Sequence, residues 1–228
     1  MKKIFLITTL SFLFFNGISQ HLSQVTFSYG SNFLWFSVIT SQNVLVRISD
    51  DGRIIESGTE EQSLYDRNYF AQKLQPYLGR IVYYGKESDS AFTGKIKSIG
   101  TCFFSYYPSN DYPEKIGKIK SAGSLLFDYY RKFDDALSAG KIKSIGINNV
   151  AYFSSFDNEA FKGKLKTVGN TSITYYSSFD DALIKGKLKS IGLYHYAWYG
   201  SLDRREFNGA LKSGTRRQLI NGITYILQ

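Results

Sequence analysis

Residues 94–100 read Gly-Lys-Ile-Lys-Ser-Ile-Gly, and this phrase returns along the chain at a fixed step of 23 residues. The copies start at Gly94, Gly117, Gly140, Gly163 and Gly186, with a decayed copy at Gly209. Self-similarity at such a period is typical of repeat architectures, in which each unit buries its apolar side chains against its neighbours. The sequence therefore predicts a tandem array of five full repeats and partial repeats at its ends.

Each repeat contains the signals of a β-hairpin. Residues 95–98 alternate between polar and apolar with a period of two, and residues 173–175 do the same, which favours strands over helices. A glycine follows the first segment, as at Gly100 and Gly146, and supplies a tight reversal. The predicted fold class is all-β, an elongated array of antiparallel β-hairpin repeats.

The second half of each repeat carries an aromatic pair and then an acidic element. The pair reads Tyr106-Tyr107 in one copy, and the element reads Phe-Asp-Asp-Ala-Leu at 133–137 and again at 179–183. We expect this element to connect one hairpin to the next through a single helical turn. An aspartate would cap its start, and the glycine of the next repeat would follow its end.

The two ends of the chain depart from the repeat. Residues 20–58 read as a β-meander cap that would cover one open edge of the array, and residues 59–78 as a linker. The array itself would occupy residues 79–228. Its end should be a C-terminal hairpin cap that turns at Asn221-Gly222, because Asn-Gly is a strong hairpin signal.

The first residues read as a secretory signal peptide spanning 1–19. Lys2 and Lys3 precede an apolar run over 4–15, and residues 17–19 are small enough for cleavage before Gln20. The apolar run is too short to span a bilayer, and no comparable run follows it. We therefore expect an exported protein that is periplasmic, secreted or peripheral to the outer membrane, with no membrane span after cleavage.

The positive charge of the chain belongs to the repeats. Residues 94–228 contain 20 Lys and Arg against 11 Asp and Glu, whereas the whole chain has a formal net charge of +9. Two lysine positions recur in every copy, and these candidate binding residues are Lys95, Lys97, Lys118, Lys120, Lys141, Lys143, Lys164, Lys166, Lys187 and Lys189, with Lys212 in the last copy. They would form either a solvated face partly neutralised by aspartates or a surface for a repeating anionic polymer or an anionic membrane surface.

The aromatic pairs offer a second candidate surface. Because side chains alternate between the two faces of a strand, one member of each pair should face the core and the other the opposite side. Packing across strands explains such a ladder, but its outward members would also suit stacking on sugar rings. These candidates are Tyr107, Tyr130, Tyr176 and Tyr199. Nucleic acid is not expected as a partner of an exported chain.

The residues of common catalytic and metal sites are scarce. The chain has two histidines, His21 and His195, and one cysteine, Cys102, so a histidine-based triad or a Cys/His metal cluster lacks its parts. Paired acids such as Asp134-Asp135 and Asp180-Asp181 fit turn formation and capping, with calcium binding as the alternative. We predict a protein that is not an enzyme and has no cofactor.

The repeat resembles several known families. The phrase Gly-Lys-[Ile/Leu]-Lys-Ser-x-Gly followed by Tyr-Tyr is similar to the β-hairpin arrays of MORN repeats and of toxin–antitoxin repeats with an NGKLKS phrase. The whole chain resembles uncharacterised exported repeat proteins of Bacteroidetes type, and its glycines and aromatic pairs more loosely resemble choline-binding cell-wall repeats. The resemblance implies a hairpin array and no particular activity.

These observations favour a non-catalytic binding or scaffold protein of the bacterial cell envelope. Its surface would be basic and aromatic, and its partner an anionic polymer, an envelope glycan or a protein. The alternatives are a polysaccharide-binding module that uses the tyrosine ladder and an immunity or antitoxin-like protein that binds an exported toxin.

Overall fold

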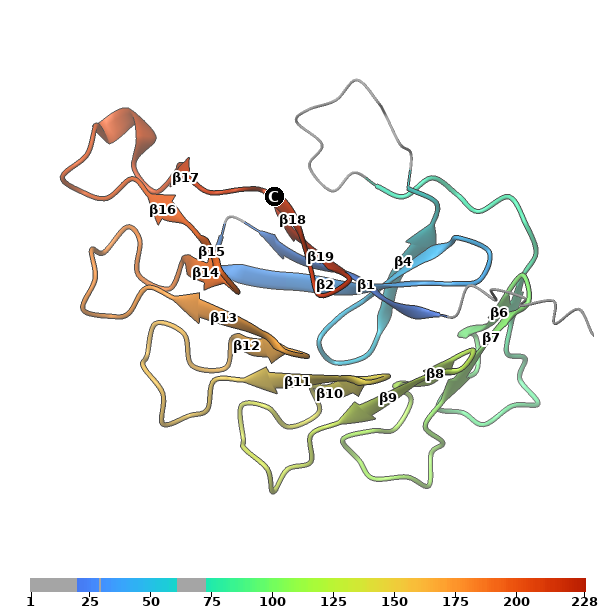
Figure 1. The fold of residues 1–228 in the computed structure, drawn as a ribbon. Helices are drawn as coiled ribbons and strands as arrows, with labels where there is room; N and C mark the ends of the chain where they lie inside the picture. Colours follow the sequence, from blue (N-terminus) through green and yellow to red (C-terminus); the bar gives the residue numbers. More distant parts are fainter. Residues whose placement is uncertain (1–19, 29, 61–72) are drawn as a thin grey trace, which may run out of the picture.

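The computed structural model describes residues 20–28, 30–60 and 73–228. The predicted signal peptide and most of the predicted linker lie outside these ranges. The described residues form strands arranged in an eleven-stranded, a six-stranded and a two-stranded sheet, with one 3₁₀ turn (Figure 1). The predicted fold class, an all-β array of antiparallel hairpins, is confirmed.

The eleven-stranded sheet is built by the repeats, in chain order from one edge to the other. Its strands are β5 (Ile81–Tyr83), β6 (Ile96–Ile99), β7 (Cys102–Tyr106), β8 (Ile119–Ala122), β9 (Leu125–Tyr129), β10 (Ile142–Ile145), β11 (Asn148–Tyr152), β12 (Leu165–Val168), β13 (Thr171–Tyr175), β14 (Leu188–Ile191) and β15 (Tyr194–His195). Each repeat contributes one hairpin, and successive hairpins pair antiparallel. Neighbouring copies therefore share hydrogen-bond ladders, as a stacking unit requires.

Glycine sets the geometry at both ends of each first strand. The reversal within the hairpin uses Gly100, whose φ is +55°, and the start of the next first strand uses Gly117, whose φ is +71°. The equivalent glycines of the other copies have positive φ as well. Residues with a side chain rarely adopt this left-handed conformation, which explains why both glycines recur in every repeat.

One face of the repeat sheet forms the core. In the second copy, Ile119, Phe127 and Tyr129 are each at most 2% exposed, and the equivalent residues of the other copies are buried too, except Ile96 and Leu211, which are half-buried. The first aromatic of each pair therefore faces inward. In three repeats its polar atom donates to a main-chain carbonyl of the same repeat: from the Tyr106 hydroxyl to Ile96 at 2.9 Å, from the Tyr129 hydroxyl to Ile119 at 2.7 Å and from Trp198 Nε1 to Leu188 at 2.7 Å.

The two ends of the chain form one sheet together. Its order is β18-β19-β1-β2-β3-β4, and β1 pairs with β19 in parallel. Its strands are β1 (His21–Ser28), β2 (Asn32–Ile39), β3 (Leu45–Ile48), β4 (Ile54–Gly58), β18 (Arg217–Ile220) and β19 (Ile223–Leu227). The predicted meander and C-terminal hairpin are both present. However, the meander does not pair with the edge strand β5, so the expectation that it covers an open edge was wrong.

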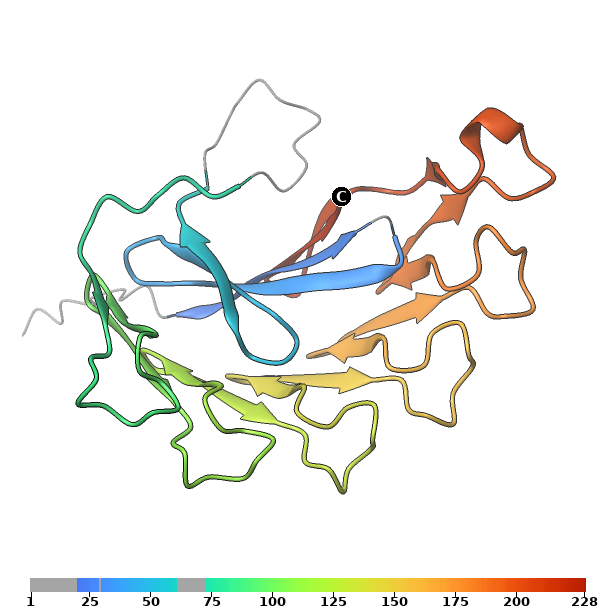
Figure 2. The same cartoon turned by 180° about the vertical axis from the view of Figure 1, so that it is seen from behind.

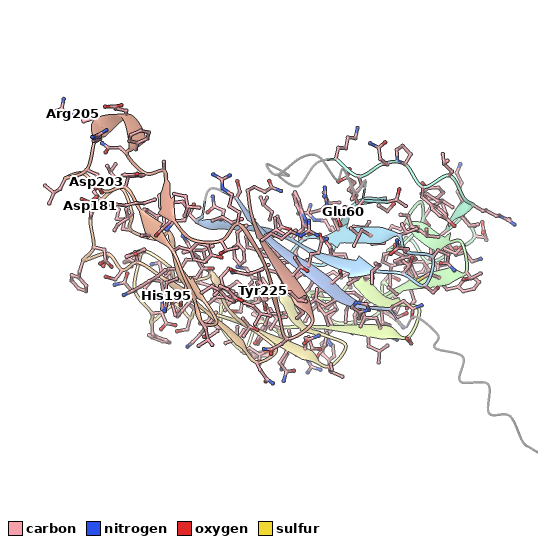
Figure 3. All side chains as sticks on the ribbon, turned by 45° about the horizontal axis from the view of Figure 1, so that its top comes forward. Glu60, Asp181, His195, Asp203, Arg205 and Tyr225 are labelled. Atoms are coloured by element: carbon pink, nitrogen blue, oxygen red, sulfur yellow. The ribbon has the colours of Figure 1, made fainter. Side chains whose placement is uncertain are left out.

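The six-stranded sheet lies inside the curve of the repeat sheet (Figures 1 and 2). Residues of both sheets belong to one hydrophobic cluster, in which Tyr225 of β19 is 1% exposed (Figure 3). Turns of the six-stranded sheet also accept hydrogen bonds from the array, including that from the Ile142 N–H to the Asp50 carbonyl at 2.7 Å. The meander and hairpin therefore cover the inner face of the array, because that face exposes the apolar side of every hairpin.

The last copy departs from the others. Strand β16 (Ala197–Trp198) pairs with β17 (Leu211–Ser213) as a separate two-stranded sheet, and the 3₁₀ turn η1 (Arg205–Phe207) lies in its connector. The segment between the meander and the array begins with an isolated bridge between Thr59 and Gln75. The described ends of the predicted linker are therefore held to each other by main-chain hydrogen bonds.

The buried tyrosines predict alkaline unfolding. Burial raises the pKa of Tyr196 and Tyr225 to about 12 from the usual 10.0, and it raises the pKa of Tyr129 and Tyr152 well above that value. A pKa raised by folding gives stability that is complete below pH 10 and is lost as pH rises through the folded pKa. Titration of tyrosinate absorbance should therefore show exposed tyrosines ionising first, and a cooperative step that coincides with loss of strand circular dichroism.

Smooth ionisation of all tyrosines near pH 10, without unfolding, would contradict this burial.

Candidate binding surface on the outer face of the repeat sheet

The two lysine positions of each repeat occupy different environments. Lys97, Lys120, Lys143, Lys166 and Lys189 are exposed on the outer face, the one turned away from the six-stranded sheet. We call these five residues, with Lys212 of the last copy, the outer lysine row. The other five sequence-predicted lysines lie at the inner side of the connectors and are half-buried. The sequence predicts one binding surface for both sets, whereas in the structure they differ in burial and lie on different sides of the repeat sheet.

A β-bulge separates the two sets. In the repeat that starts at Gly140, the pairing of β9 with β10 shifts between Ile142 and Ser144, which places the irregularity at Lys143. The same shift recurs in each of the equivalent pairings from β5–β6 to β16–β17. Two residues of a bulged strand oppose one residue of its partner, so the strict alternation of faces is lost there. Lys143 and Ser144 therefore both face outward, while Lys141 lies on the other side of the bulge.

The inner lysines are structural. Each ammonium group donates to the main-chain carbonyl of the glycine that starts the next repeat, as from Lys141 to Gly163 at 2.8 Å and from Lys164 to Gly186 at 2.6 Å. The same groups lie 4.5 to 5.2 Å from the centre of the first aromatic ring of the pair. Burial lowers the pKa of Lys95, Lys118, Lys164 and Lys187. Each inner lysine therefore links its repeat to the next one by a hydrogen bond.

The different roles of the two lysine sets give a testable difference in stability. Lys164→Ala removes a charge-assisted hydrogen bond and should lower the free energy of unfolding by about 1.5 to 3 kcal/mol. Lys166→Ala, two residues further along the chain, removes only an exposed contact with the Phe153 ring and should lower it by about 0.5 to 1 kcal/mol at most. Urea unfolding of both variants measures the difference. Equal losses would contradict the separation of the two sets.

The outer lysines lie over aromatic rings. Their ammonium groups are 5.1 to 5.6 Å from the centres of the second aromatic rings, which belong to Tyr84, Tyr107, Tyr130, Phe153, Tyr176 and Tyr199. Contacts of this kind between a cation and an aromatic face are favourable by about 0.5 to 1 kcal/mol at exposed positions. The rings therefore restrict the conformations of the outer lysine row before any ligand binds.

The tyrosine ladder is less open than the sequence analysis expected. Tyr107, Tyr130, Tyr176 and Tyr199 are half-buried rather than exposed. The hydroxyl groups of the first three donate to main-chain carbonyls of the next hairpin, at 2.8 Å for Tyr107 to Phe127. Because a lysine also lies over each ring, these residues do not present free aromatic faces for stacking on sugars. These contacts are structural, and stacking of these rings on sugars stays a prediction.

The paired acids hold the connectors. Asp157 accepts from the Ser154 N–H at 2.6 Å and closes its own turn, and Asp180 bonds Ser177 in the same way. The second acid of a pair bonds to the following repeat: the Asp135 carboxylate accepts from the N–H and the hydroxyl group of Ser155. Bonds from the backbone and hydroxyl group of Ser155 lower the pKa of Asp135. The acids therefore cap their own turns and link successive repeats. The described residues contain no group of three potential metal ligands.

The predicted connector turn is also present. The Asp135 carboxylate accepts from the Leu137 N–H at 2.9 Å, and its carbonyl accepts from the Ala139 N–H four residues on, at 3.0 Å. Gly140 then follows with a φ of +76°. One turn, capped by an aspartate and ended by a glycine, therefore joins successive hairpins.

Sequence analysis missed the tips of these connectors. Phe133, Phe156, Phe179 and Leu202 are almost completely exposed. The available signal was an apolar residue that recurs every 23 positions directly before a turn-forming aspartate. We interpreted these residues only as part of the connector, since burial of phenylalanine is the usual outcome.

The remaining sequence candidates do not converge on one site. His195 is exposed on the short strand β15 at one edge of the repeat sheet, whereas Cys102 belongs to β7 near the opposite edge (Figure 1). Cys102 is 2% exposed, and burial raises the pKa of its thiol to about 11, which disfavours the reactive thiolate. Neither residue lies in the outer lysine row.

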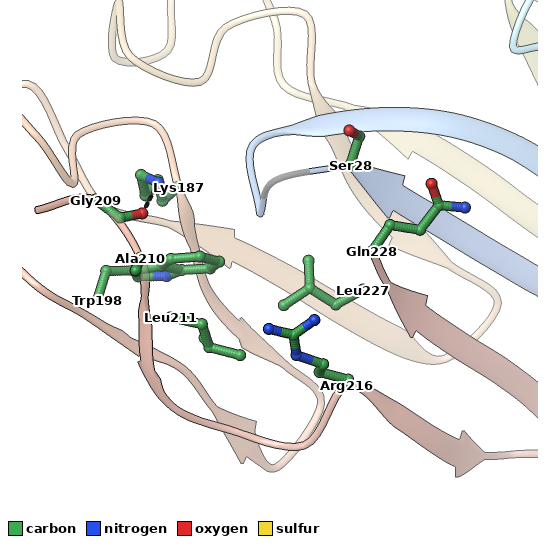
Figure 4. A pocket seen from close by; sticks show the side chains of 9 residues that line it. All are labelled: Ser28, Lys187, Trp198, Gly209, Ala210, Leu211, Arg216, Leu227 and Gln228. Carbon is green, nitrogen blue, oxygen red and sulfur yellow. Dashed lines mark hydrogen bonds between the residues drawn. The ribbon is translucent and has the colours of Figure 1, made fainter. Parts of the chain in front are cut away.

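A separate cavity of about 430 Å³ lies where the last repeat meets the end of the chain (Figure 4). Trp198, Leu211 and Leu227 supply its apolar lining, and Arg216 and Lys187 supply positive charge. The ammonium group of Lys187 is already bonded to the Gly209 carbonyl. Of the sequence-predicted binding residues, this cavity contains Lys187 alone.

No family model, no curated protein and no solved structure matches the chain. Among the described residues, no helix has the length and apolar character needed to cross a membrane.

Proposed function

We propose that the chain is a non-catalytic, exported binding protein of the bacterial cell envelope whose outer lysine row binds an anionic polymer. Export follows from the signal-peptide pattern of residues 1–19. The binding role rests mainly on one observation. Five exposed lysines recur at the same position of successive hairpins on a sheet face that no other described element covers.

Charge is segregated on this face. The strands β5 to β15 contain five lysines and only one acidic residue, Asp128, which pairs with Lys115 of a connector. The other acids of the repeats lie in the connectors, where they bond backbone and serine groups. Within the described residues, none of the five lysines of β5 to β15 has a carboxylate within 4.0 Å. Neutralisation by aspartate rows is therefore a weaker explanation of this face.

The row has further features that suit a polymer. Equivalent strands of successive hairpins lie roughly 10 Å apart, so cations recur at about that interval. Cations held over aromatic rings lose less side-chain entropy when they bind, which favours association. A chain that carries regularly spaced carboxylate, sulfate or phosphate groups would engage several copies together.

Retention on a sulfated-dextran column tests the proposal. The triple variant Lys120→Ala, Lys143→Ala and Lys166→Ala should elute at much lower salt than the parent. The logarithm of its affinity should also depend less steeply on salt, by about one unit of slope for each lysine lost.

The matched control is Lys132→Ala, Lys162→Ala and Lys185→Ala, which removes the same charge from exposed connector positions. Equal weakening of both triple variants would show a general charge effect and contradict a defined row. Selective binding of one protein, with no retention on any polyanion, would instead favour the immunity-type alternative.

A further inference from the structure

Each repeat has a main-chain N–H group on its inner side that is placed to donate a hydrogen bond. It belongs to the isoleucine or leucine that follows the Gly-Lys start of the first strand. In three repeats this N–H donates to a carbonyl in a turn of the six-stranded sheet: Ile119 to Gly52 at 3.2 Å, Ile142 to Asp50 at 2.7 Å, and Leu188 to Gly30 at 2.5 Å. We call these positions corners, and these three corners are filled.

Three equivalent corners are open. The N–H groups of Ile96, Leu165 and Leu211 receive no carbonyl from the described part of the six-stranded sheet. Each of these residues instead lines a cavity, of about 450 Å³ at Ile96, about 310 Å³ at Leu165 and about 430 Å³ at Leu211. Open corners and cavities therefore coincide in all three cases.

The filled corners show what kind of group fits. Their occupants are peptide units of turns, which place a carbonyl oxygen on the N–H, and at Ile119 and Leu188 a glycine of the turn also packs against an aromatic ring. A Cβ atom at Gly52 would lie 2.1 Å from the Tyr129 hydroxyl oxygen, and one at Gly30 would lie 2.0 Å from the Trp198 ring. The occupant is thus a secondary amide with a small neighbouring group packed on an aromatic side chain.

The corner at Leu165 is bordered by other polar and aromatic groups on an open surface. It lies between the filled corners at Ile142 and Leu188, and its cavity is also lined by Asn32, Phe33 and Asp50. The Asp50 carboxylate is partly exposed and its nearest cation is Lys141, at 3.5 Å. This carboxylate supplies an acceptor for an amide N–H, while the Leu165 N–H supplies the donor for its carbonyl.

A second observation marks this corner. Tyr152 lines the cavity, and its buried hydroxyl group has no hydrogen-bond partner among the described residues. Of the equivalent residues, Tyr106 and Tyr129 donate to main-chain carbonyls at 2.9 and 2.7 Å, whereas the hydroxyl group of Tyr175, in the repeat that contains Leu165, is likewise unpaired among the described residues. Buried polar groups are nearly always paired, so an unpaired one beside a cavity indicates an incomplete site.

We propose that the open corners, foremost the one at Leu165, bind a secondary amide group of a ligand, whose carbonyl accepts from the strand N–H as the internal turns do. Such an amide occurs in the acetamido group of N-acetylated sugars and in a peptide main chain. The inference does not depend on binding of an anionic polymer, because the corners lie on the opposite side of the repeat sheet from the outer lysine row.

Amide chemical shifts of the isotope-labelled full-length mature protein test this proposal. Two probes are titrated, N-acetylglucosamine and N-acetylglycine methylamide, with glucose as the matched control without an amide. The Leu165 amide proton should move downfield and saturate in the millimolar range, with smaller changes at Ile96 and Leu211. The filled corners at Ile119, Ile142 and Leu188 should not move, since an internal carbonyl already occupies them.

A response to the sugar alone assigns the source as an acetamido sugar, and a response to the peptide amide alone assigns a peptide. Saturable shifts with glucose, or no shift at Leu165 with either amide, would overturn the proposal. Asn32→Trp should fill the Leu165 cavity and remove the response there while Ile96 still responds. Unchanged signals from the filled corners would show that this variant remains folded.

Discussion

Removal of residues 216–228 is expected to abolish cooperative folding of the chain. These residues form the hairpin β18–β19, and β19 is an internal strand between β18 and β1. Ile223, Tyr225 and Leu227 are each at most 4% exposed, and burial of three such side chains contributes about 6 kcal/mol. The total stability of a domain is about 5 to 15 kcal/mol, so little would remain.

Thermal unfolding followed by circular dichroism measures this loss. The matched control is Leu219→Ser in the same hairpin, because Leu219 is 68% exposed and its replacement should leave the melting temperature nearly unchanged. A truncated chain that still melts cooperatively at the original temperature would show that the array is stable without the hairpin. That result would agree with two independent end caps and not with one shared sheet.

Gly52→Ala is expected to lower the free energy of unfolding by about 2 to 5 kcal/mol. Gly52 has a φ of +82°, a conformation that costs a residue with a side chain about 1 to 2 kcal/mol. The new methyl group would also overlap the buried Tyr129, whose hydroxyl oxygen lies 2.1 Å from its ideal position, and such overpacking costs about 1 to 3 kcal/mol. Denaturant unfolding gives the value directly.

Gly222→Ala is the control for backbone strain alone. Gly222 has a φ of +78°, and an added Cβ atom would meet nothing within 4 Å. Its replacement should therefore cost only about 1 to 2 kcal/mol. If both alanine variants lost the same stability, the turn at Gly52 would not be packed against Tyr129.

The repeat and its hairpins are predictable from the sequence because the responsible signals are local. A fixed 23-residue step, glycines such as Gly146 and alternation over four residues determine each hairpin without reference to distant parts of the chain. The same holds for the turn at Asn221-Gly222, where Asn221 has a φ of +51° and Gly222 a φ of +78°. Stacking of identical units then follows from the units themselves.

Joining of the two chain ends was not predictable in the same way. The parallel pairing of β1 with β19 connects residues such as Val25 and Tyr225, which are 200 positions apart. No turn or spacing in the sequence specifies such a pairing. One signal was available in the meander, since residues 33–39 include a nearly continuous apolar run. Such runs are typical of strands that are covered on both faces, which an edge cap would not be.

Separation of the lysines into two sets was also not predictable from spacing. Two residues such as Lys141 and Lys143 should share one face of a regular strand. The bulge at Lys143 breaks this rule, and the sequence contains no marker for it beyond its recurrence in every copy. The open corners are a consequence of where the turns of the six-stranded sheet end, so they too required the tertiary arrangement.

The central feature of the fold is the docking of the six-stranded sheet against the inner face of the repeats. A scalar coupling across the hydrogen bond between the Ile142 amide nitrogen and the Asp50 carbonyl carbon reports this contact directly in solution. We expect the coupling to be present and the Ile142 amide to exchange with solvent only through global unfolding. Absence of the coupling, together with rapid exchange of that amide in the folded protein, would contradict it.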